Sequence, residues 1–448
     1  MISANLTEPA TARHSSASDS EAYLDRILAA ADNPDWLIQR RRKALEMFHA
    51  TPLPERSAHL WRYTDPNLFL PSEFTEDNSD GTPPGEPSES RPPFDRRLVS
   101  GVIHCWNGSV SSIDLDPDVV NAGVKIIGLN EAAREYPEIV RNHLGSLIGP
   151  GFGKFEALAN AFWSGGLLVY VPKNVEVAKP VHVTNGSALN GSVHFQRHLV
   201  VVEENSSLTL VDEYGQGNGA TEPKLRTHAI IELLAGAHAR LNFVTIQNWG
   251  REAVSCATHR AQLGAGAKLE TVMTSLGSRI AKIDCGAILS GTGAESNFFG
   301  LAVGTEQQHF DHHTVHDHQA GSTHSDLHFK IAVRDRANSV YTGLIRIDEG
   351  AQFCEAYQEN RNLILSPKAR AESIPELEIM NNEVRCTHGA TVGKVNPEEI
   401  FYLQSRGINQ ADAIRLIVTG FVGPILDRIP EFTRERLHHA VLQRLGEE

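Results

Sequence analysis

The sequence predicts a mainly β protein whose core is a parallel β-helix, flanked in the chain by α-helical domains at both ends. Three observations lead to this fold class. Strand-like apolar runs recur through the middle of the chain at a nearly constant spacing. Both ends show helical periodicity instead. The chain has 448 residues, of which 41% are hydrophobic and 21% charged, which suits one long domain with smaller attachments.

The N-terminal part is expected to be a helical and mixed region over residues 20–150. Residues 1–19 are small and polar, so we expect a disordered tail there. Helical spacing predicts helices at SEAYLDRILAAA, at PDWLIQRRRKALEMFHAT and at NEAAREYPEIVRNHLGSL. Residues 72–95 combine Pro, Ser, Gly and acidic residues, which is typical of a mobile loop.

The β-helix core is expected over residues 151–392, where each apolar run is followed by a turn of small residues. A repeat near 29 residues with two strands per repeat indicates a stacked solenoid, because each coil buries its apolar face against its neighbours. Glycine suits the corners, which need positive φ or close approach of the backbone. The aligned turns lie at Ser206, Gly236, Gly266, Gly293, Gly321 and Gly350, in steps of 30, 30, 27, 28 and 29 residues.

The C-terminal domain, residues 393–448, is predicted to be helical. Asn396 and Glu399 have the spacing of a capping box, and Pro397 suits a first helical residue. Gly407 would end that helix, and two further apolar stripes predict helices within residues 409–429 and 430–446.

Composition and charge argue against several classes of function and several cellular locations. A net charge of −14 argues against binding to nucleic acid, which requires basic residues. No apolar run approaches the roughly 20 residues needed to span a membrane, and the first residues lack a secretory pattern. The five cysteines are widely spaced, which favours free thiols in a reducing compartment. We therefore expect a cytoplasmic protein without a membrane partner.

The stretch FDHHTVHDHQAGSTHSD, residues 310–326, has the highest density of histidines in the chain. His312, His316 and His318 should share one strand face, since alternate residues point the same way. The carboxylate of a cupin site, an HExxH motif and a nearby cysteine are all missing. We interpret these histidines as polar strand residues, some hydrogen-bonded to neighbouring coils, and leave metal binding by residues 309–328 open.

GPGFGKFEAL, residues 149–158, resembles a phosphate-binding loop only superficially. Its first glycine is too close to Lys154, and Phe155 stands where Ser or Thr must contact magnesium. No nucleophile elbow or cysteine-protease signature occurs elsewhere. We therefore predict no catalytic residue.

Cys386 and His388, in the stretch NNEVRCTHGATVGKV, are the candidate metal-binding residues. One residue separates them, so on a strand both would point to the same side. Thiolate and imidazole are ligands for iron, zinc and copper. The stretch lies where the solenoid ends, so a partner could complete a site that two ligands cannot form alone.

Several blocks of the sequence resemble the SufB/SufD family of iron–sulfur cluster assembly proteins. The most specific is PELEIMNNEVRCTHGATVGKVNPEEIFYLQSRGINQADAIRLIVTGF, residues 375–421, and LWRYTD, KFEALANAFWSGGLLVYVPKNVEVAKPVHV and DHHTVHDH support it. The resemblance covers the chain from about residue 20 to its end. It implies a right-handed parallel β-helix with helical regions at both ends.

The family resemblance also implies partners. SufB and SufD pair through their β-helix ends, and the C-terminal helices of each dock a SufC ATPase, so this chain would be a non-catalytic scaffold subunit. It would hold no stable cofactor alone, and a transient iron–sulfur cluster would form at the SufB–SufD interface. The resemblance leaves open a homodimer of the isolated chain and a flavin in the complex.

Two positions favour a SufD-type subunit over a SufB-type one. SufB-type chains carry a cysteine where this chain has Asn360, and His-Glu-Ala-Thr where it has His388-Gly389-Ala390-Thr391. His388 is retained, and in SufD-type chains this histidine is implicated in cluster assembly at the SufB interface. The resemblance assigns no role to Cys386. The C-terminal residues that contact SufC are also open, with Phe401, Tyr402 and Arg406 as candidates.

Two other functions remain open at this point. One is a SufB-like scaffold that works as a homodimer with SufC. A β-helix polysaccharide lyase or esterase is a third class, which would need charged clusters along the solenoid groove and a secretion signal.

Overall fold

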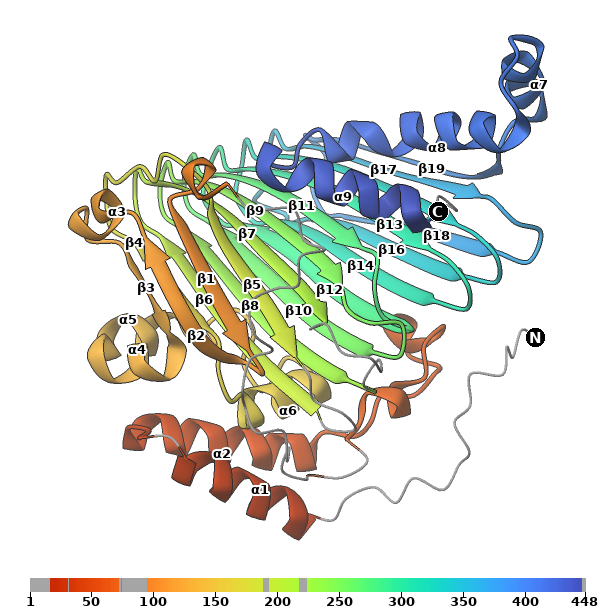
Figure 1. Ribbon diagram of the computed structural model, residues 1–448. Coiled ribbons are helices and arrows are strands. Elements are labelled where there is room, and N and C mark those ends of the chain that lie inside the picture. The colour runs from red at the N-terminus through yellow and green to blue at the C-terminus, as the bar shows by residue number, and fades with distance from the viewer. Residues whose placement is uncertain are drawn as a thin grey trace.

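The centre of the computed structural model is a solenoid in which successive strands alternate between two sheets (Figure 1). The structure describes residues 17–30, 32–71, 74, 95–187, 193–216 and 224–444. The predicted mainly β fold with a parallel β-helix core is confirmed. The strands are β1 (Gly101–Trp106), β2 (Ser109–Leu115), β3 (Lys125–Gly128), β4 (Leu167–Val171), β5 (Val181–Ser187), β6 (Val193–Val202), β7 (Ser207–Gln216), β8 (Arg226–Ala235), β9 (Arg240–Asn248), β10 (Val254–Leu263), β11 (Lys268–Ser275), β12 (Ile280–Leu289), β13 (Glu295–Gly304), β14 (His309–His318), β15 (His324–Val333), β16 (Asn338–Ile347), β17 (Glu355–Ile364), β18 (Arg370–Ile379) and β19 (Arg385–Lys394).

The two ends of the solenoid differ. Odd-numbered strands from β5 to β19 form one sheet with β1 and β2, and even-numbered strands from β4 to β18 form the other with β3. Neighbours within the coils are parallel, but β2 and β3 close the N-terminal end with antiparallel pairs. At the other end, among the strands that the structure describes, β18 pairs only with β16, and β19 pairs only with β17. We call the coil formed by β18 and β19 the open end.

The corners follow the predicted repeat, because the six aligned turns precede β7, β9, β11, β13, β15 and β17. Each turn contains one residue with φ between 56° and 72°. Glycine fills this position at two corners only, so side chains tolerate the conformation at the others. Gly236 is needed for a different reason, since a Cβ there would lie 2.8 Å from the Glu204 amide nitrogen. The residues with positive φ are Asn205, His238, Gly266, Gly293, Ser322 and Phe353.

The N-terminal helices form a separate apolar core against the first coils. Leu24 of α1 (Ala17–Ala30) and Leu37 of α2 (Asp35–Ala50) are buried with Phe162 of α6 (Lys154–Phe162). Residues 17–19 belong to α1, which corrects the expected tail at that point. Asp19 lies in the first turn, where the helix dipole favours a negative charge. Residues 1–16 and almost all of 72–95 lie outside the described part of the chain.

The single helix expected over residues 130–147 is two helices. They are α4 (Leu129–Glu135) and α5 (Pro137–His143), and the break falls at Tyr136. Pro137 explains the break, because proline has no N–H and its ring disfavours helical backbone in the preceding residue. A further short helix, α3, covers Pro117–Asn121.

Residues 51–71, which we call the strap, cross the outer face of the nine-stranded sheet. Phe69 is buried beside Phe155 and Ile280, near the middle of the solenoid. Farther along, His59 lies 3.1 Å from the Glu376 carboxylate on β18. The strap therefore connects the N-terminal helices with the open end. It contains two short 3₁₀ helices, His59–Trp61 and Pro66–Phe69, and a third lies at Arg96–Leu98.

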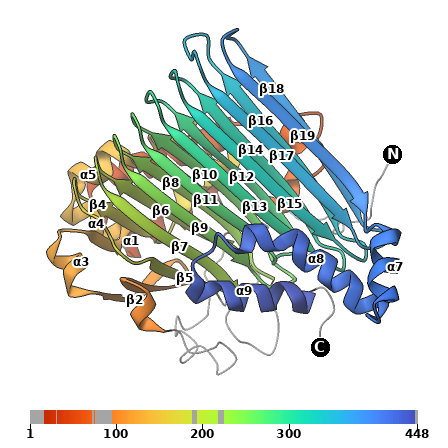
Figure 2. The same ribbon diagram turned by 90° about the horizontal axis from the view of Figure 1, so that it is seen from above.

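The C-terminal helices are α7 (Pro397–Ser405), α8 (Gln410–Leu426) and α9 (Glu431–Arg444), close to the predicted positions. The side chain of Asn396 accepts from the Glu398 amide at the start of α7, and Gly407 follows its end with a φ of 88°. Figure 2 shows α8 and α9 along the side of the solenoid, with α7 projecting beyond them. In the described residues, no helix has both the length and the apolarity to cross a lipid bilayer.

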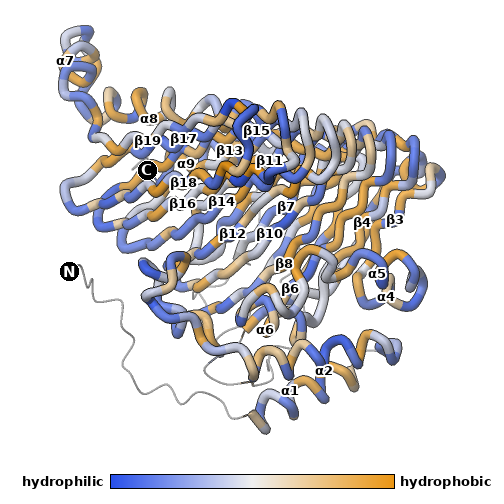
Figure 3. The backbone as a smooth tube through the Cα atoms, turned by 180° about the vertical axis from the view of Figure 1, so that it is seen from behind, coloured by the Kyte–Doolittle hydropathy of each residue, from blue (hydrophilic) through white to orange (hydrophobic). Residues whose placement is uncertain are grey.

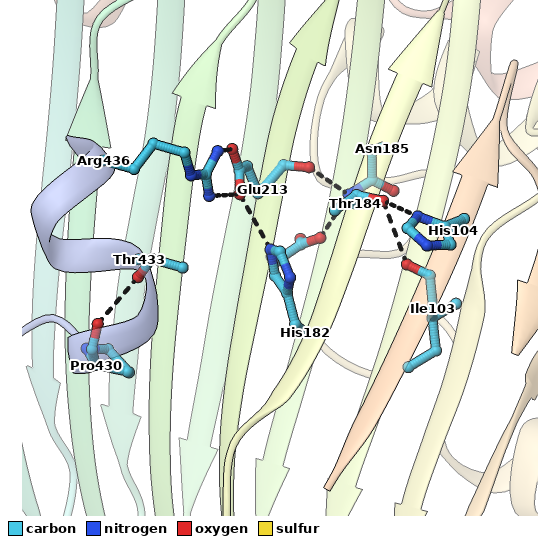
Figure 4. Close-up of polar contacts among 10 residues, drawn as sticks. Ile103, His104, His182, Thr184, Asn185, Glu213, Pro430, Thr433 and Arg436 are labelled. Atoms are coloured by element: carbon cyan, nitrogen blue, oxygen red, sulfur yellow. Dashed lines mark hydrogen bonds and ion pairs between the residues drawn. The ribbon is translucent and has the colours of Figure 1, made fainter. Parts of the chain in front are cut away.

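A buried ion pair fastens α9 to the start of the solenoid (Figure 4). The two terminal guanidinium nitrogens of Arg436, Nη1 and Nη2, donate to the Glu213 carboxylate on β7. The other contact to that carboxylate comes from His182 on β5, whose Nε2 lies 3.0 Å from Glu213 Oε2. Phe432 packs edge-on against the His182 ring. We call Glu213, Arg436 and His182 the latch.

Candidate functional site

The open end presents Cys386 and His388 on the same face of β19. Parallel pairing aligns Cys386 with Ala356 and His388 with Gln358 on β17. Ala356 and Gln358 are buried in the interior of the solenoid, so alternation places Cys386 and His388 on the interior-facing side. The predicted shared orientation is therefore present. Since β19 is the last strand of its sheet, no described strand covers this side chain pair from beyond.

Cys386 and His388 differ in their surroundings. Cys386 is half-buried and packs against an apolar cluster that includes Cys354 and Ile347. Burial raises the pKa of the Cys386 thiol to about 11. His388 is exposed. The imidazole is therefore the donor that a second molecule can reach directly, and the thiol lies at the base of the same site. All five cysteines are free.

Three buried carboxamides line the interior one strand below this pair. They belong to Gln358, Asn360 and Asn362, at alternate positions of β17. Asn362 Nδ2 donates to Asn360 Oδ1 at 2.6 Å and to the Thr391 carbonyl of β19 at 3.0 Å. Asn360 Nδ2 donates to the Phe329 carbonyl. The strand under the open end is therefore polar on its inner side, whereas apolar residues dominate the strands of the first coils (Figure 3).

The donors at the open end are too few for a complete metal site. Iron–sulfur clusters are held by about four ligands, mainly cysteine thiolates. The part of the chain that the structure describes contains no group of three or more His, Cys, Asp or Glu side chains arranged to hold a metal ion. Cys386 and His388 can supply two donors, so a cluster at the open end needs ligands from another molecule.

Exposed apolar side chains surround the open end and α7. Phe353 is 64% exposed at the corner before β17, where its amide bonds the Glu383 carbonyl. Met380 and Val392 are also exposed. On α7, which buries none of its residues, Phe401 is 72% exposed and Tyr402 is 57% exposed. Of the three candidates for partner contact, Arg406 lies over the Tyr402 ring, 5.3 Å from its centroid.

The interior-facing histidines of β14 bond to neighbouring strands, as expected. His312 bonds Ser275 at 2.8 Å, His316 bonds Ser296 at 3.1 Å, and His318 bonds Ser325 at 2.9 Å. Burial lowers their pKa values to about 3 for His312 and His316 and about 4 for His318, which keeps the rings neutral. These side chains are structural hydrogen-bonding groups of the coil.

The other face of β14 points outward and lies under the strap. Asp311 is buried there, with Lys282 Nζ at 2.9 Å and His313 Nε2 at 2.8 Å. Thr64 of the strap donates to the same carboxylate at 2.5 Å, and its hydroxyl also contacts His309. The Lys282 ammonium group contacts both Asp311 and His313 and lies where these two side chains converge. Hydrogen bonds and an ion pair therefore stabilise this histidine-rich stretch, and its outward-facing side chains do not form a set of metal ligands.

Lys154, in the glycine-rich stretch that resembles a phosphate-binding loop, is also structural. Its ammonium group donates to the Phe48 and Thr51 carbonyls, both at 2.7 Å. These carbonyls belong to the end of α2 and the residue after it, where helix carbonyls lack partners. The lysine therefore joins α6 to α2.

Sequence reasoning identified the β19 pair but missed the carboxamides beneath it. The signal is in the sequence: Gln358, Asn360 and Asn362 alternate along a strand, where apolar residues are expected to face a solenoid interior. Alternation alone does not show which side of β17 faces the interior, because that depends on the boundaries and register of the strand.

Comparison with known protein families agrees with this architecture. A model described as "SUF system FeS cluster assembly, SufBD core domain" matches residues 182–421, and one described as "SufBD protein N-terminal region" matches residues 24–183. An iron–sulfur cluster assembly SufBD family protein of Staphylococcus epidermidis is 28% identical over 426 residues, covering 92% of this chain and 90% of the relative. The iron–sulfur cluster assembly protein SufB of Bacillus subtilis has the same identity and coverage.

The core model spans 240 of the 448 residues, counted from 182 to 421, and the two models together extend from the N-terminal helices to α8. The chain therefore belongs to the SufBD family of iron–sulfur cluster assembly proteins.

Proposed function

We propose that this chain is a SufD-type scaffold subunit of an iron–sulfur cluster assembly complex. In this proposal it pairs with SufB through the open end and docks the SufC ATPase through its C-terminal helices. One observation carries the proposal: the solenoid ends on an edge strand, paired on one side only among the described residues, that presents Cys386 and His388 as two donors of an incomplete site. ATP hydrolysis belongs to SufC, and we assign no catalytic residue to this chain.

The backbone of the open end supports pairing with a second solenoid. Edge strands have a row of unpaired N–H and C=O groups, which can bond another strand. β18 contains Pro375, which removes one donor, whereas β19 contains no proline and has ten residues. Phe353, Met380 and Val392 add apolar surface that a partner would cover.

The chemistry of the donors supports a role in cluster assembly. The iron–sulfur cluster is here the cargo of the complex, and SufB would supply the remaining thiolate and carboxylate ligands at the interface. His388 can offer an imidazole nitrogen to iron, and its exposure lets a metal held by a partner reach it. Cys386 is protonated at neutral pH because burial raises its pKa to about 11, and bound iron would favour the thiolate.

The C-terminal helices support a second docking surface. Helix α7 buries no residue against its own chain, and its two exposed aromatic side chains, Phe401 and Tyr402, are of the type enriched at interfaces. Helices α8 and α9 are held on the solenoid, so force applied at α7 would be transmitted to the coils. This is the physical basis for a scaffold that responds to ATP-driven movement of SufC.

The SufD-type assignment rests on two residues. Asn360 and Gly389 stand where SufB-type chains have a cysteine and a glutamate, and their side chains provide neither a thiolate nor a carboxylate to iron. A SufB-like homodimer is the second candidate, favoured by the similarity to a relative named SufB. If a gene next to the gene for this chain encodes a SufB with the cysteine and the His-Glu-Ala-Thr pattern, the SufD-type assignment is favoured.

The test is anaerobic co-expression with SufB and SufC, followed by iron and sulfide analysis of the purified complex. We expect His388→Ala to leave the three subunits together and to lower both iron and sulfide. His324→Ala is the matched control, because His324 is also an exposed strand histidine but lies on an outward-facing position of β15. Normal iron and sulfide in the His388→Ala complex would refute the assignment.

A second variant tests the docking surface separately. Replacing Phe401 and Tyr402 with alanine should release SufC and leave SufB bound, because α7 lies outside the two sheets, beyond the end of β19 (Figure 1), and its side chains are not part of the β18–β19 coil. Retention of SufC in a pull-down of this variant would show that SufC binds elsewhere.

A further inference from the structure

Gln358 has an unusual environment in the interior of the solenoid. Its side chain is 0% exposed, and its Nε2 donates to the Gly343 carbonyl of β16 at 3.2 Å. Because β16 belongs to the opposite sheet, the carboxamide extends across the interior. The other end of the same group, Oε1, is buried and has no hydrogen-bond partner among the described residues. A buried acceptor without a partner is unfavourable by about 1–3 kcal/mol, so such a group calls for an explanation.

His388 is the residue positioned to provide the missing donor. Gln358 and His388 are aligned in the parallel pairing of β17 and β19, where strands lie about 4.8 Å apart and aligned side chains lie on the same face. The aligned neighbours on either side offer no alternative, since Ala356 faces Cys386 and Asn360 faces Ala390. An imidazole always carries at least one N–H donor, and a carboxamide oxygen accepts it.

We propose that Gln358 positions His388 by accepting a ring N–H through Oε1. This bond fixes which nitrogen of the neutral ring carries the proton and directs the other nitrogen away from the interior, toward the open end. Groups that orient a metal-binding histidine in this way commonly affect metal affinity by about 10- to 100-fold. The inference rests on the proposed function only in treating His388 as a donor to iron.

The surroundings of Gln358 fit this role. A Cβ on Gly343 would collide with Gln358 Nε2 and would lie 2.6 Å from the Tyr341 hydroxyl, so glycine leaves the room that the crossing carboxamide needs. Tyr341 is already bonded to Thr314 at 2.7 Å, so its hydroxyl has a partner of its own. A neutral amide also avoids the large penalty of burying a carboxylate in this interior.

The experiment compares Gln358→Met, which keeps the length and flexibility of the side chain but removes the acceptor, with wild type. Gln358→Leu is a second variant without the acceptor. Gln358→Glu is the conservative variant, because burial favours the neutral carboxyl group, whose O–H can donate to the Gly343 carbonyl while its other oxygen stays an acceptor. Asn360→Leu is the matched control, because it removes a buried carboxamide from the same strand without facing His388. Circular dichroism and thermal unfolding select the variants that remain folded.

The first readout is the ring-nitrogen NMR signature of His388 in ¹⁵N-histidine-labelled full-length protein, assigned by its loss in His388→Ala. We expect one dominant tautomer in wild type, Gln358→Glu and Asn360→Leu, and a shift toward the mixture of an exposed histidine in Gln358→Met and Gln358→Leu. The same signature in wild type and in both acceptor-free variants would overturn the proposal, whatever the cluster content.

The second readout is iron in the complex with SufB and SufC. We expect about 10-fold less retained iron in Gln358→Met, with Gln358→Glu close to wild type. If the NMR signature changes while both Gln358→Met and His388→Ala retain normal iron, the hydrogen bond stands and the proposed function of His388 is refuted. The two failures are therefore distinguishable.

Discussion

Replacing Arg436 with methionine should detach α9 from the solenoid without unfolding the solenoid itself. Arg436→Met leaves the Glu213 carboxylate buried, with His182 as its remaining side-chain partner. Breaking a fully buried ion pair is unfavourable by about 3–5 kcal/mol. The Arg436 side chain is 27% exposed, so water can compensate in part, and we expect about 2–3 kcal/mol. The methionine keeps most of the apolar contact of the arginine stem.

Hydrogen exchange measures this change directly. A loss of about 2–3 kcal/mol in local opening free energy corresponds to roughly 30- to 150-fold faster amide exchange. The effect should be confined to α9 (residues 431–444), while amides of β9 to β17 keep their protection. Arg434→Met is the control, because the Arg434 guanidinium bonds the Ile429 carbonyl within the C-terminal region. Unchanged exchange in α9, or equal acceleration throughout the solenoid, would refute the reasoning.

The latch should also be insensitive to mild acid. Burial alone would raise the pKa of Glu213, but hydrogen bonds and charges from Arg436 and His182 outweigh it and hold the pKa well below its usual value. A carboxylate with a lowered pKa contributes stability that is complete above the unfolded pKa of about 4.3 and is lost as the pH falls through the folded pKa. Exchange of α9, corrected for the intrinsic rate, should therefore be the same between pH 5 and 8.

Three further variants or modifications test the interior and the strap. Asp311→Asn should lower the free energy of unfolding by about 3–5 kcal/mol in urea titrations, because the buried Lys282 ammonium loses its counter-charge; an unchanged midpoint would contradict the ion-pair geometry. Gly343→Ala should destabilise by about 1–3 kcal/mol, since the new methyl group collides with Gln358, and a wild-type melting temperature would show that the carboxamide lies elsewhere. Cys386 should alkylate slowly at pH 8, with roughly two-hundredfold less thiolate than an ordinary cysteine, and its rate should rise up to a midpoint near pH 11; a midpoint near 8.5 would contradict its burial.

The repeat made the solenoid predictable from the sequence alone. Turn residues at nearly equal steps placed six corners, because a stacked coil must return to the same corner after the same length of chain. The start of α7 was predictable for a similarly local reason, since Asn396 and Pro397 satisfy the first turn of a helix by themselves. Features that depend on local backbone requirements are therefore the ones most readily predicted from a sequence.

The arrangement of the strap and the latch could not be predicted in this way. Thr64 and Asp311, like Glu213 and Arg436, are separated by more than 200 residues, and neither pair has a periodic or local signature. The candidate site could be predicted from the sequence only in part. Strand alternation predicted that Cys386 and His388 share a face, but Gln358 became relevant only when the register of β17 and β19 was known.

The unequal ends of the solenoid have a consequence for its energetics. In a one-dimensional stack each coil is stabilised by its intrinsic folding free energy and by its interfaces with the coils before and after it. The coil of β18 and β19 has an interface on one side only, whereas β2 and β3 cover the opposite end. Local opening of this coil therefore requires less free energy than opening of any other coil. Fraying starts there and moves inward one coil at a time. A molecule that binds this coil adds the missing nearest-neighbour interaction. Its binding free energy makes opening of the coil less favourable, and this orders the residues around Cys386 and His388.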